Sequence, residues 1–178
     1  KGILAWNRTF EAAGLGSVIE LRPFEAGGDF DAGNPLVSKV MADLHSTSER
    51  LSVSVFTDPS DGLISAGSIT VPAGIRGALR EEALFSIADV DERWRLYDVP
   101  EEAFCEALAA KVMKAFARVL GLDANYAGSF AYSPSQLRDP QFTVTRGITA
   151  SVTDDVLFNT LARPGDRERG VATVVNQP

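Results

Sequence analysis

Histidine and cysteine, the residues that most often carry metal-binding or nucleophilic chemistry, each occur once in the 178 residues, as His45 and Cys105. Metal clusters of His and Cys, Cys–His catalytic pairs and disulfide frameworks all need more of these residues. His45 lies at the end of a predicted helix, and Asp43 cannot orient it because residues two apart on a helix do not share a face. Cys105 lies in the first turn of another predicted helix, where glutamates oppose its ionisation, so we expect it to pack in the core.

The acidic clusters and glycine-rich segments contain no complete functional motif. The segment 29–34 has the acidic residues of a calcium loop, but Val40 stands where the loop needs its final glutamate. Gly14-Leu15-Gly16 lacks the third glycine and the following helix of a dinucleotide-binding loop, and no Gly-x-Ser-x-Gly turn occurs. The neighbouring acids Asp154 and Asp155 are interpreted as solvated caps. From the sequence we therefore predict no catalytic residue, no metal ligand and no cofactor.

The charge balance limits the classes of partner. The formal net charge is −7, which argues against binding nucleic acid through a basic patch. No apolar run is long enough for a membrane span, so we expect a soluble protein, in the cytoplasm or in an assembled particle, without membrane contact. The 13 arginines greatly outnumber the 4 lysines. This bias fits bidentate ion pairs at interfaces, and it equally fits a GC-rich genome.

Periodicity and capping signals predict a mixture of helices and strands. In chain order, the expected elements are a strand over 17–22, a helix over 36–44, a hairpin of strands 51–55 and 63–71, a helix over 74–88, a helix over 101–120, a strand over 142–153, a short helix after Asp154 and a strand over 171–175. The helix over 101–120 has the widest apolar stripe, with acids in its first turns, bases toward its end and Gly121 to cap it. We expect this helix to anchor the core.

The order of these elements shows no regular strand–helix–strand rhythm. We therefore predict an α+β fold in which a mainly antiparallel sheet packs against two or three helices around a single core. A chain of this length is expected to form one globular domain over residues 1–178.

Two segments carry residue types that are enriched at protein interfaces. One places Trp and Tyr beside arginines, although burial of its tryptophan in the core is an equally good interpretation. The other is a loop of mixed charge that fits a solvated turn or a salt-bridged subunit contact. The candidate interface residues are Arg93, Trp94, Arg95, Tyr97, Arg163, Arg167 and Arg169.

The sequence favours a role without catalysis. Our first hypothesis is a non-enzymatic structural or interaction subunit of a larger assembly, such as a virion or phage-particle component, whose partners are other protein subunits or copies of itself. The alternative is a small, hydrolase-like enzyme with a site of Asp, Glu, Arg and Tyr built from the loops 27–33 and 125–139. A third hypothesis is a ligand-binding regulatory module that uses the hydroxyl-rich face of the predicted strand 142–153.

Overall fold

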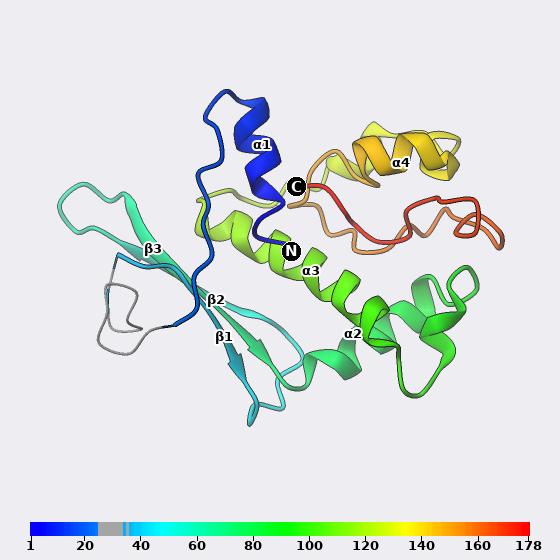
Figure 1. The fold of residues 1–178 in the computed structure, drawn as a ribbon, viewed down its shortest axis with the longest axis horizontal. Coiled ribbons are helices and arrows are strands. Elements are labelled where there is room, and N and C mark those ends of the chain that lie inside the picture. Colours follow the sequence, from blue (N-terminus) through cyan, green and yellow to red (C-terminus); the bar gives the residue numbers. More distant parts are fainter. Residues whose placement is uncertain (25–33, 35) are drawn as a thin grey trace.

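The computed structural model of the protein describes residues 1–24, 34 and 36–178. Among them the elements are α1 (Trp6–Ala12), β1 (Lys39–Asp43), β2 (Ser52–Thr57), β3 (Ile64–Pro72), α2 (Ile75–Ser86), η1 (Glu92–Arg95), α3 (Glu101–Val119), η2 (Gly128–Ala131), η3 (Gln136–Arg138) and α4 (Pro140–Arg146). Helix α3 runs through the centre, with the sheet on one side and the C-terminal residues on the other (Figure 1). The predicted α+β class is confirmed.

The sheet has three strands in the order β1-β3-β2. Strands β2 and β3 form the predicted antiparallel hairpin, while β1 pairs with β3 in parallel, so the sheet is mixed and the expectation of a mainly antiparallel sheet is corrected. The helix predicted over 36–44 is wrong, because β1 occupies this segment. Its residue Val40 lies opposite Ile69 of β3, and this long-range pairing outweighs the helical spacing of the apolar residues.

Helices α2 and α3 confirm the helices predicted over 74–88 and 101–120. Helix α3 ends at Val119, and the expected capping glycine, Gly121, follows with a φ of 79°. The Gly121 N–H donates to Arg118 O at 3.1 Å and the Leu122 N–H donates to Ala117 O at 2.9 Å. These two bonds form a Schellman motif, which ends the helix because glycine accepts the left-handed conformation.

The buried face of α3 differs from the predicted stripe of large apolar residues. It consists mostly of small residues, whereas Phe104, Leu108 and Phe116 are only half-buried. The buried residues are Ala103, Ala107, Ala110, Met113, Ala115, Ala117 and Val119. Cys105 is exposed because it lies two residues from both Ala103 and Ala107, on the opposite face of the helix. Its predicted burial is therefore wrong.

The C-terminal half contains less regular structure than predicted. The strand expected over 142–153 is wrong: its beginning lies in α4, which Asp139 caps by accepting from the Phe142 N–H at 2.8 Å. The short helix expected after Asp154 does not form, since the Asp154 carboxylate accepts from the Ser129 N–H instead. The terminal strand reduces to one antiparallel bridge between Phe158 and Val174.

The N-terminal segment contains a helix that the sequence patterns did not predict. The Trp6 indole of α1 is buried and donates to Met113 O of α3 at 3.1 Å. Residues 17–22 form no strand; Asn7 of α1 holds this segment, accepting from the Ile19 N–H at 2.8 Å and donating to Ile19 O at 2.9 Å. Among the described residues, no helix is long and apolar enough to cross a membrane.

Candidate functional site

The first predicted interface segment lies in and after η1, and its four side chains have different surroundings. Trp94 is 1% exposed and packs edge-to-face on Phe158, with ring centroids 5.6 Å apart. Tyr97 is 94% exposed. Arg95 is half-exposed and lies 2.9 Å from Asp89. Trp94 is thus part of the core, while Tyr97 and Arg95 remain on the surface.

The fourth residue of this segment, Arg93, belongs to a network of charges around Asp91. The Asp91 carboxylate is fully buried and lies 2.6 Å from Arg93 Nη2 and 3.3 Å from Arg167 Nε. Arg93 Nη2 also lies 2.9 Å from Glu106 of α3. The hydrogen bond to Asp91 raises the pKa of the Arg93 guanidinium above its ordinary value. Asp91 therefore joins two predicted interface arginines that are far apart in the sequence.

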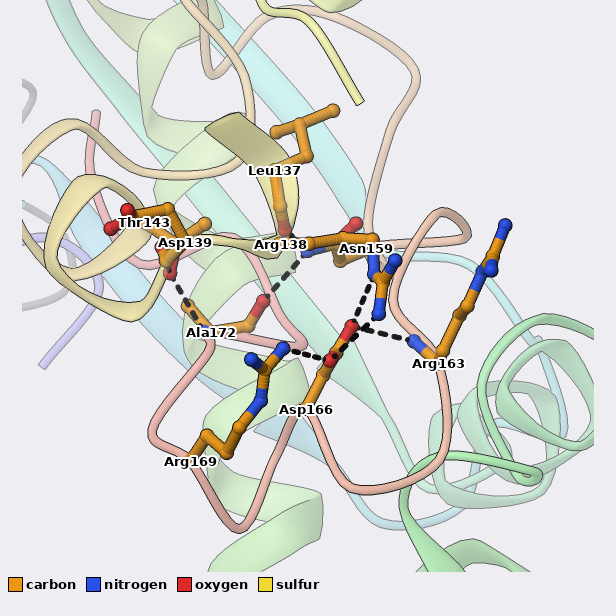
Figure 2. Close-up of polar contacts among 9 residues, drawn as sticks. All are labelled: Leu137, Arg138, Asp139, Thr143, Asn159, Arg163, Asp166, Arg169 and Ala172. Atoms are coloured by element: carbon orange, nitrogen blue, oxygen red, sulfur yellow. Dashed lines mark hydrogen bonds and ion pairs between the residues drawn. The ribbon is translucent and has the colours of Figure 1, made fainter. Parts of the chain in front are cut away.

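The second predicted segment is organised around another buried carboxylate, Asp166 (Figure 2). Arg138 donates to it twice, at 2.7 and 3.2 Å, the Arg163 N–H donates at 2.9 Å, and Arg169 adds a further hydrogen bond. The Arg163 side chain points away from the carboxylate in Figure 2. The hydrogen bond from Arg138 is the largest cause of an Asp166 pKa far below its ordinary value. The loop that contains Arg163 and Arg169 is thus stabilised by its own carboxylate, Asp166.

Neutral hydrogen bonds extend this cluster to α4 (Figure 2). Asn159 donates to Leu137 O at 2.7 Å and to Ala172 O at 3.1 Å. The Thr143 hydroxyl accepts from the Ala172 N–H at 3.0 Å and donates to Asp139 O at 3.0 Å. These bonds hold segments without regular structure together, so the cluster has a structural role.

A groove of about 720 Å³ lies beside the Asp91 network. Its walls are the N-terminal residues up to Arg8, one side of α3 and the C-terminal segment 171–176. Both chain ends lie next to α3 in Figure 1. Arg93 and Arg167 line the groove, together with Glu106 and Met113. Sequence reasoning missed this groove, because its walls come from three distant segments.

The alternative enzyme site is only partly covered by the structure. The loop 27–33 and the acidic part of the calcium-loop segment lie outside the described residues. The other loop, 125–139, contains the short helices η2 and η3. His45 is exposed in the turn after β1. In the parts of the chain that the structure describes, no group of three or more His, Cys, Asp or Glu residues is placed to hold a metal ion.

Comparison with known proteins gives one finding. A family model described as Met-zincin matches residues 97–176, which is less than half of the chain. No curated protein and no solved structure matches. The matched region contains α3, α4 and the Asp166 cluster.

The name of this family implies zinc, so the donor atoms of the matched region decide whether a zinc ion fits. Metzincin enzymes hold zinc with the motif H-E-x-x-H-x-x-G-x-x-H, whose first two histidines lie one turn apart on a helix. The matched region contains no histidine, since His45 precedes it. Its long helix α3 is followed closely by Gly121.

Placing the glycine of the motif on Gly121 assigns a residue to each functional position. Lys114 and Arg118 on α3 and Ala124 after it take the three histidine positions, and Ala115 takes the position of the glutamate base. Lysine and arginine are cations at neutral pH and alanine has no donor atom, so this set does not fit zinc. The Lys114 ammonium lies 2.7 Å from Asp155 and lowers the pKa of that carboxyl.

Proposed function

We propose that this chain is a non-enzymatic domain that binds another protein chain, and that residues 97–176 are a zincin-like region without a zinc site. The observation that carries the proposal is the residue set Lys114, Ala115, Arg118 and Ala124 on and after α3. Three histidines and a glutamate are needed at these positions for zinc-dependent hydrolysis. None of the four residues supplies a ligand or a general base.

The electrostatics of α3 support the same interpretation. Lys114 and Arg118 are four residues apart, so their positive charges lie on one side of the helix and repel a dication. Lys111 adds a third charge one turn earlier and lies 2.8 Å from Glu82 of α2. Lys111 and Lys114 form ion pairs that connect α3 to α2 and to Asp155. A metal site at these positions would need neutral imidazoles in place of the ammonium groups.

The groove beside Asp91 and two exposed side chains support the proposed binding to another protein. The groove beside Asp91 is lined by both apolar and charged residues, a composition that suits a polypeptide. Exposed Tyr97 and Arg95 lie outside that groove and remain candidate contacts. A more specific role as a virion or phage-particle component stays a prediction, as does pairing with copies of itself.

A metal and hydrolysis assay on the purified 178-residue chain tests the proposal. After refolding or expression in the presence of zinc and dialysis, we expect far less than one zinc per chain by elemental analysis. We also expect no cleavage of a quenched fluorescent peptide library beyond the rate in a buffer blank. One retained zinc per chain, together with cleavage that a chelator abolishes, would overturn the proposal.

A further inference from the structure

The groove beside Asp91 differs in charge from the rest of the molecule. Its charged lining residues are Lys1, Arg8, Arg93, Arg167 and Glu106. The lining residues carry four positive charges and one negative charge, and the buried Asp91 beside them pairs with Arg93 and Arg167; the excess positive charge therefore comes from Lys1 and Arg8, in a chain with a net charge of −7. Such a local excess attracts an acidic partner, because the field is strongest in a concave site with low-dielectric walls.

The cations of the groove are of two kinds. Arg93 and Arg167 are held by the buried Asp91, and this pairing orients them. Arg8 is exposed on α1 and has no ion-pair partner among the residues that the structure describes. Arg8 can therefore take a carboxylate from a partner without losing an internal contact.

The C-terminal wall of the groove has unused backbone hydrogen-bonding capacity. The Asn159 N–H donates to Thr173 O at 2.9 Å and the Val175 N–H donates to Leu157 O at 3.0 Å. In this pattern Phe158 and Val174 form a non-hydrogen-bonded pair, so the N–H and C=O of Val174 point away from residue 158. Within residues 1–24, 34 and 36–178, neither group of Val174 has a hydrogen-bond partner. Val174 belongs to one isolated bridge and is only 7% exposed, but it lines the groove, so an extended segment seated there can pair with these two backbone groups as strands pair at a sheet edge.

We propose that the groove binds an acidic segment of another protein in extended conformation, which pairs with the backbone at Val174 and places a carboxylate beside Arg8. The apolar part of the lining, which includes Leu4 and Met113, would receive alternate side chains of the segment. This inference rests on the proposed function, since it names the class of partner. An acidic strand fits better than a basic one, because a basic strand would meet Lys1 and Arg8, whose charges no ion pair balances among the described residues.

Fluorescence polarisation with two labelled ten-residue peptides tests this inference. One peptide alternates valine and glutamate, and its counterpart alternates valine and lysine. The acidic peptide is expected to bind and the basic peptide not to bind. Arg8→Glu is expected to weaken binding roughly tenfold, since it removes one attraction and adds one repulsion. The matched control is Arg50→Glu, an equal charge reversal at an exposed arginine outside the groove, which should leave affinity within about twofold.

Methylated peptides test the backbone pairing separately from charge. N-methyl groups on every second amide block hydrogen bonding along one edge of the peptide only, because backbone groups alternate in direction along a strand. We expect one of the two methylation patterns to abolish binding of the acidic peptide and the other to retain it.

The inference would be overturned by absence of binding, by equal binding of both peptides, or by equal loss of affinity in Arg8→Glu and Arg50→Glu. Loss of binding with both methylation patterns, or with neither, would refute pairing at a strand edge. Self-association that Arg8→Glu abolishes would identify a second copy of the chain as the occupant and also overturn it. The metal and hydrolysis assay tests the proposed function independently of peptide binding. If the chain holds no zinc and also fails to bind the acidic peptide, only this inference is overturned.

Discussion

The buried Asp166 carboxylate joins Arg138 to the loop that contains Arg163 and Arg169, and its replacement by asparagine is predicted to destabilise the protein strongly. The side chain is 2% exposed and accepts from Arg138, from Arg169 and from the Arg163 N–H. Asparagine has nearly the same shape, but it carries no charge and turns one acceptor into a donor. An NH2 group would then face groups that are themselves donors.

The magnitude follows from the partners that lose their acceptor. Breaking a buried ion pair from one side costs about 3–5 kcal/mol. The Arg138 and Arg169 side chains are 34% and 57% exposed, so water can solvate them after the substitution and the cost is smaller. We expect Asp166→Asn to lower the free energy of unfolding by about 2–4 kcal/mol. For a chain of this length, that corresponds to a decrease in Tm of roughly 5–15 °C.

Thermal and urea unfolding of the variant, followed by circular dichroism, measures this loss. The matched control is Asp89→Asn, because Asp89 makes one ion pair with Arg95 and its side chain is 91% exposed. This exposed pair is expected to contribute less than about 1 kcal/mol. The reasoning would be refuted if Asp166→Asn unfolded within 2 °C of the unmodified protein, or if both variants were destabilised equally, with ~2 °C taken as the shift of a weak surface effect.

Two further predictions concern titratable groups. The hydrogen bond from Arg138 lowers the pKa of Asp166 in the folded protein, so the stabilisation by the ionised carboxylate is fully present above the unfolded pKa of about 4 and is lost as the pH falls below that value. Urea unfolding from pH 7 to pH 3 should therefore show a shrinking difference in the free energy of unfolding between the unmodified protein and Asp166→Asn. A difference that stays constant with pH would contradict this assignment. Cys105 is exposed, and the pKa of its thiol is raised mainly by partial desolvation and also by its contact with Glu101. An aromatic disulfide reagent at pH 8 should therefore label one thiol per native chain, more slowly than it labels free cysteine. Labelling only after denaturation would contradict the exposed position.

The sequence correctly predicted the helices and strands whose conformation is determined by residues within the element or directly beside it. The hairpin of β2 and β3 was predicted because its strands flank a turn of five residues that contains proline and glycine. Helices α2 and α3 were predicted because their apolar spacing, end charges and the glycine after α3 agree with one another. The α+β class followed from these elements.

The remaining elements depend on contacts that a local pattern does not contain. Strand β1 has apolar residues at helical spacing, and its parallel pairing with β3, in which Val40 lies opposite Ile69, makes it a strand. Helix α4 contains threonines and valine, which favour strands, but Asp139 and Pro140 start a helix and Thr143 returns its hydroxyl bond to Asp139 O. A capping signal in the sequence, Asp followed by Pro, was present and outweighed the alternation of apolar and hydroxyl residues.

The candidate site shows the same division. The sequence predicts Arg93, Arg167 and Arg169 as interface residues, which stays a prediction, while the structure pairs Arg93 with the neighbouring Asp91 and Arg169 with the neighbouring Asp166. The sequence did not show that one acid, Asp91, joins Arg93 to Arg167, since these residues are far apart in the sequence. The groove was missed for the same reason, as no local pattern brings α1, α3 and the C-terminal segment together.

The proposed position of a zincin-like motif on α3 can be tested by introducing histidines at the positions of its ligands. The triple variant Lys114→His, Arg118→His and Ala124→His changes two exposed or half-exposed helix positions and one exposed residue after the helix, so it should fold. The double variant at 114 and 118 is the matched control, since two imidazoles make an incomplete zinc site. Restored binding would show that α3 keeps the arrangement of a zinc helix without its ligands.

The most direct measurement of the central claim is therefore a zinc titration of three proteins in competition with a chromophoric chelator. We predict no zinc binding by the unmodified chain, weak binding by the double variant, and one zinc per chain in the triple variant with a Kd on the order of 1 μM or lower. A stoichiometric zinc ion bound by the unmodified chain would contradict the account. A folded triple variant that binds zinc no better than the double variant would contradict the placement of the motif on Gly121.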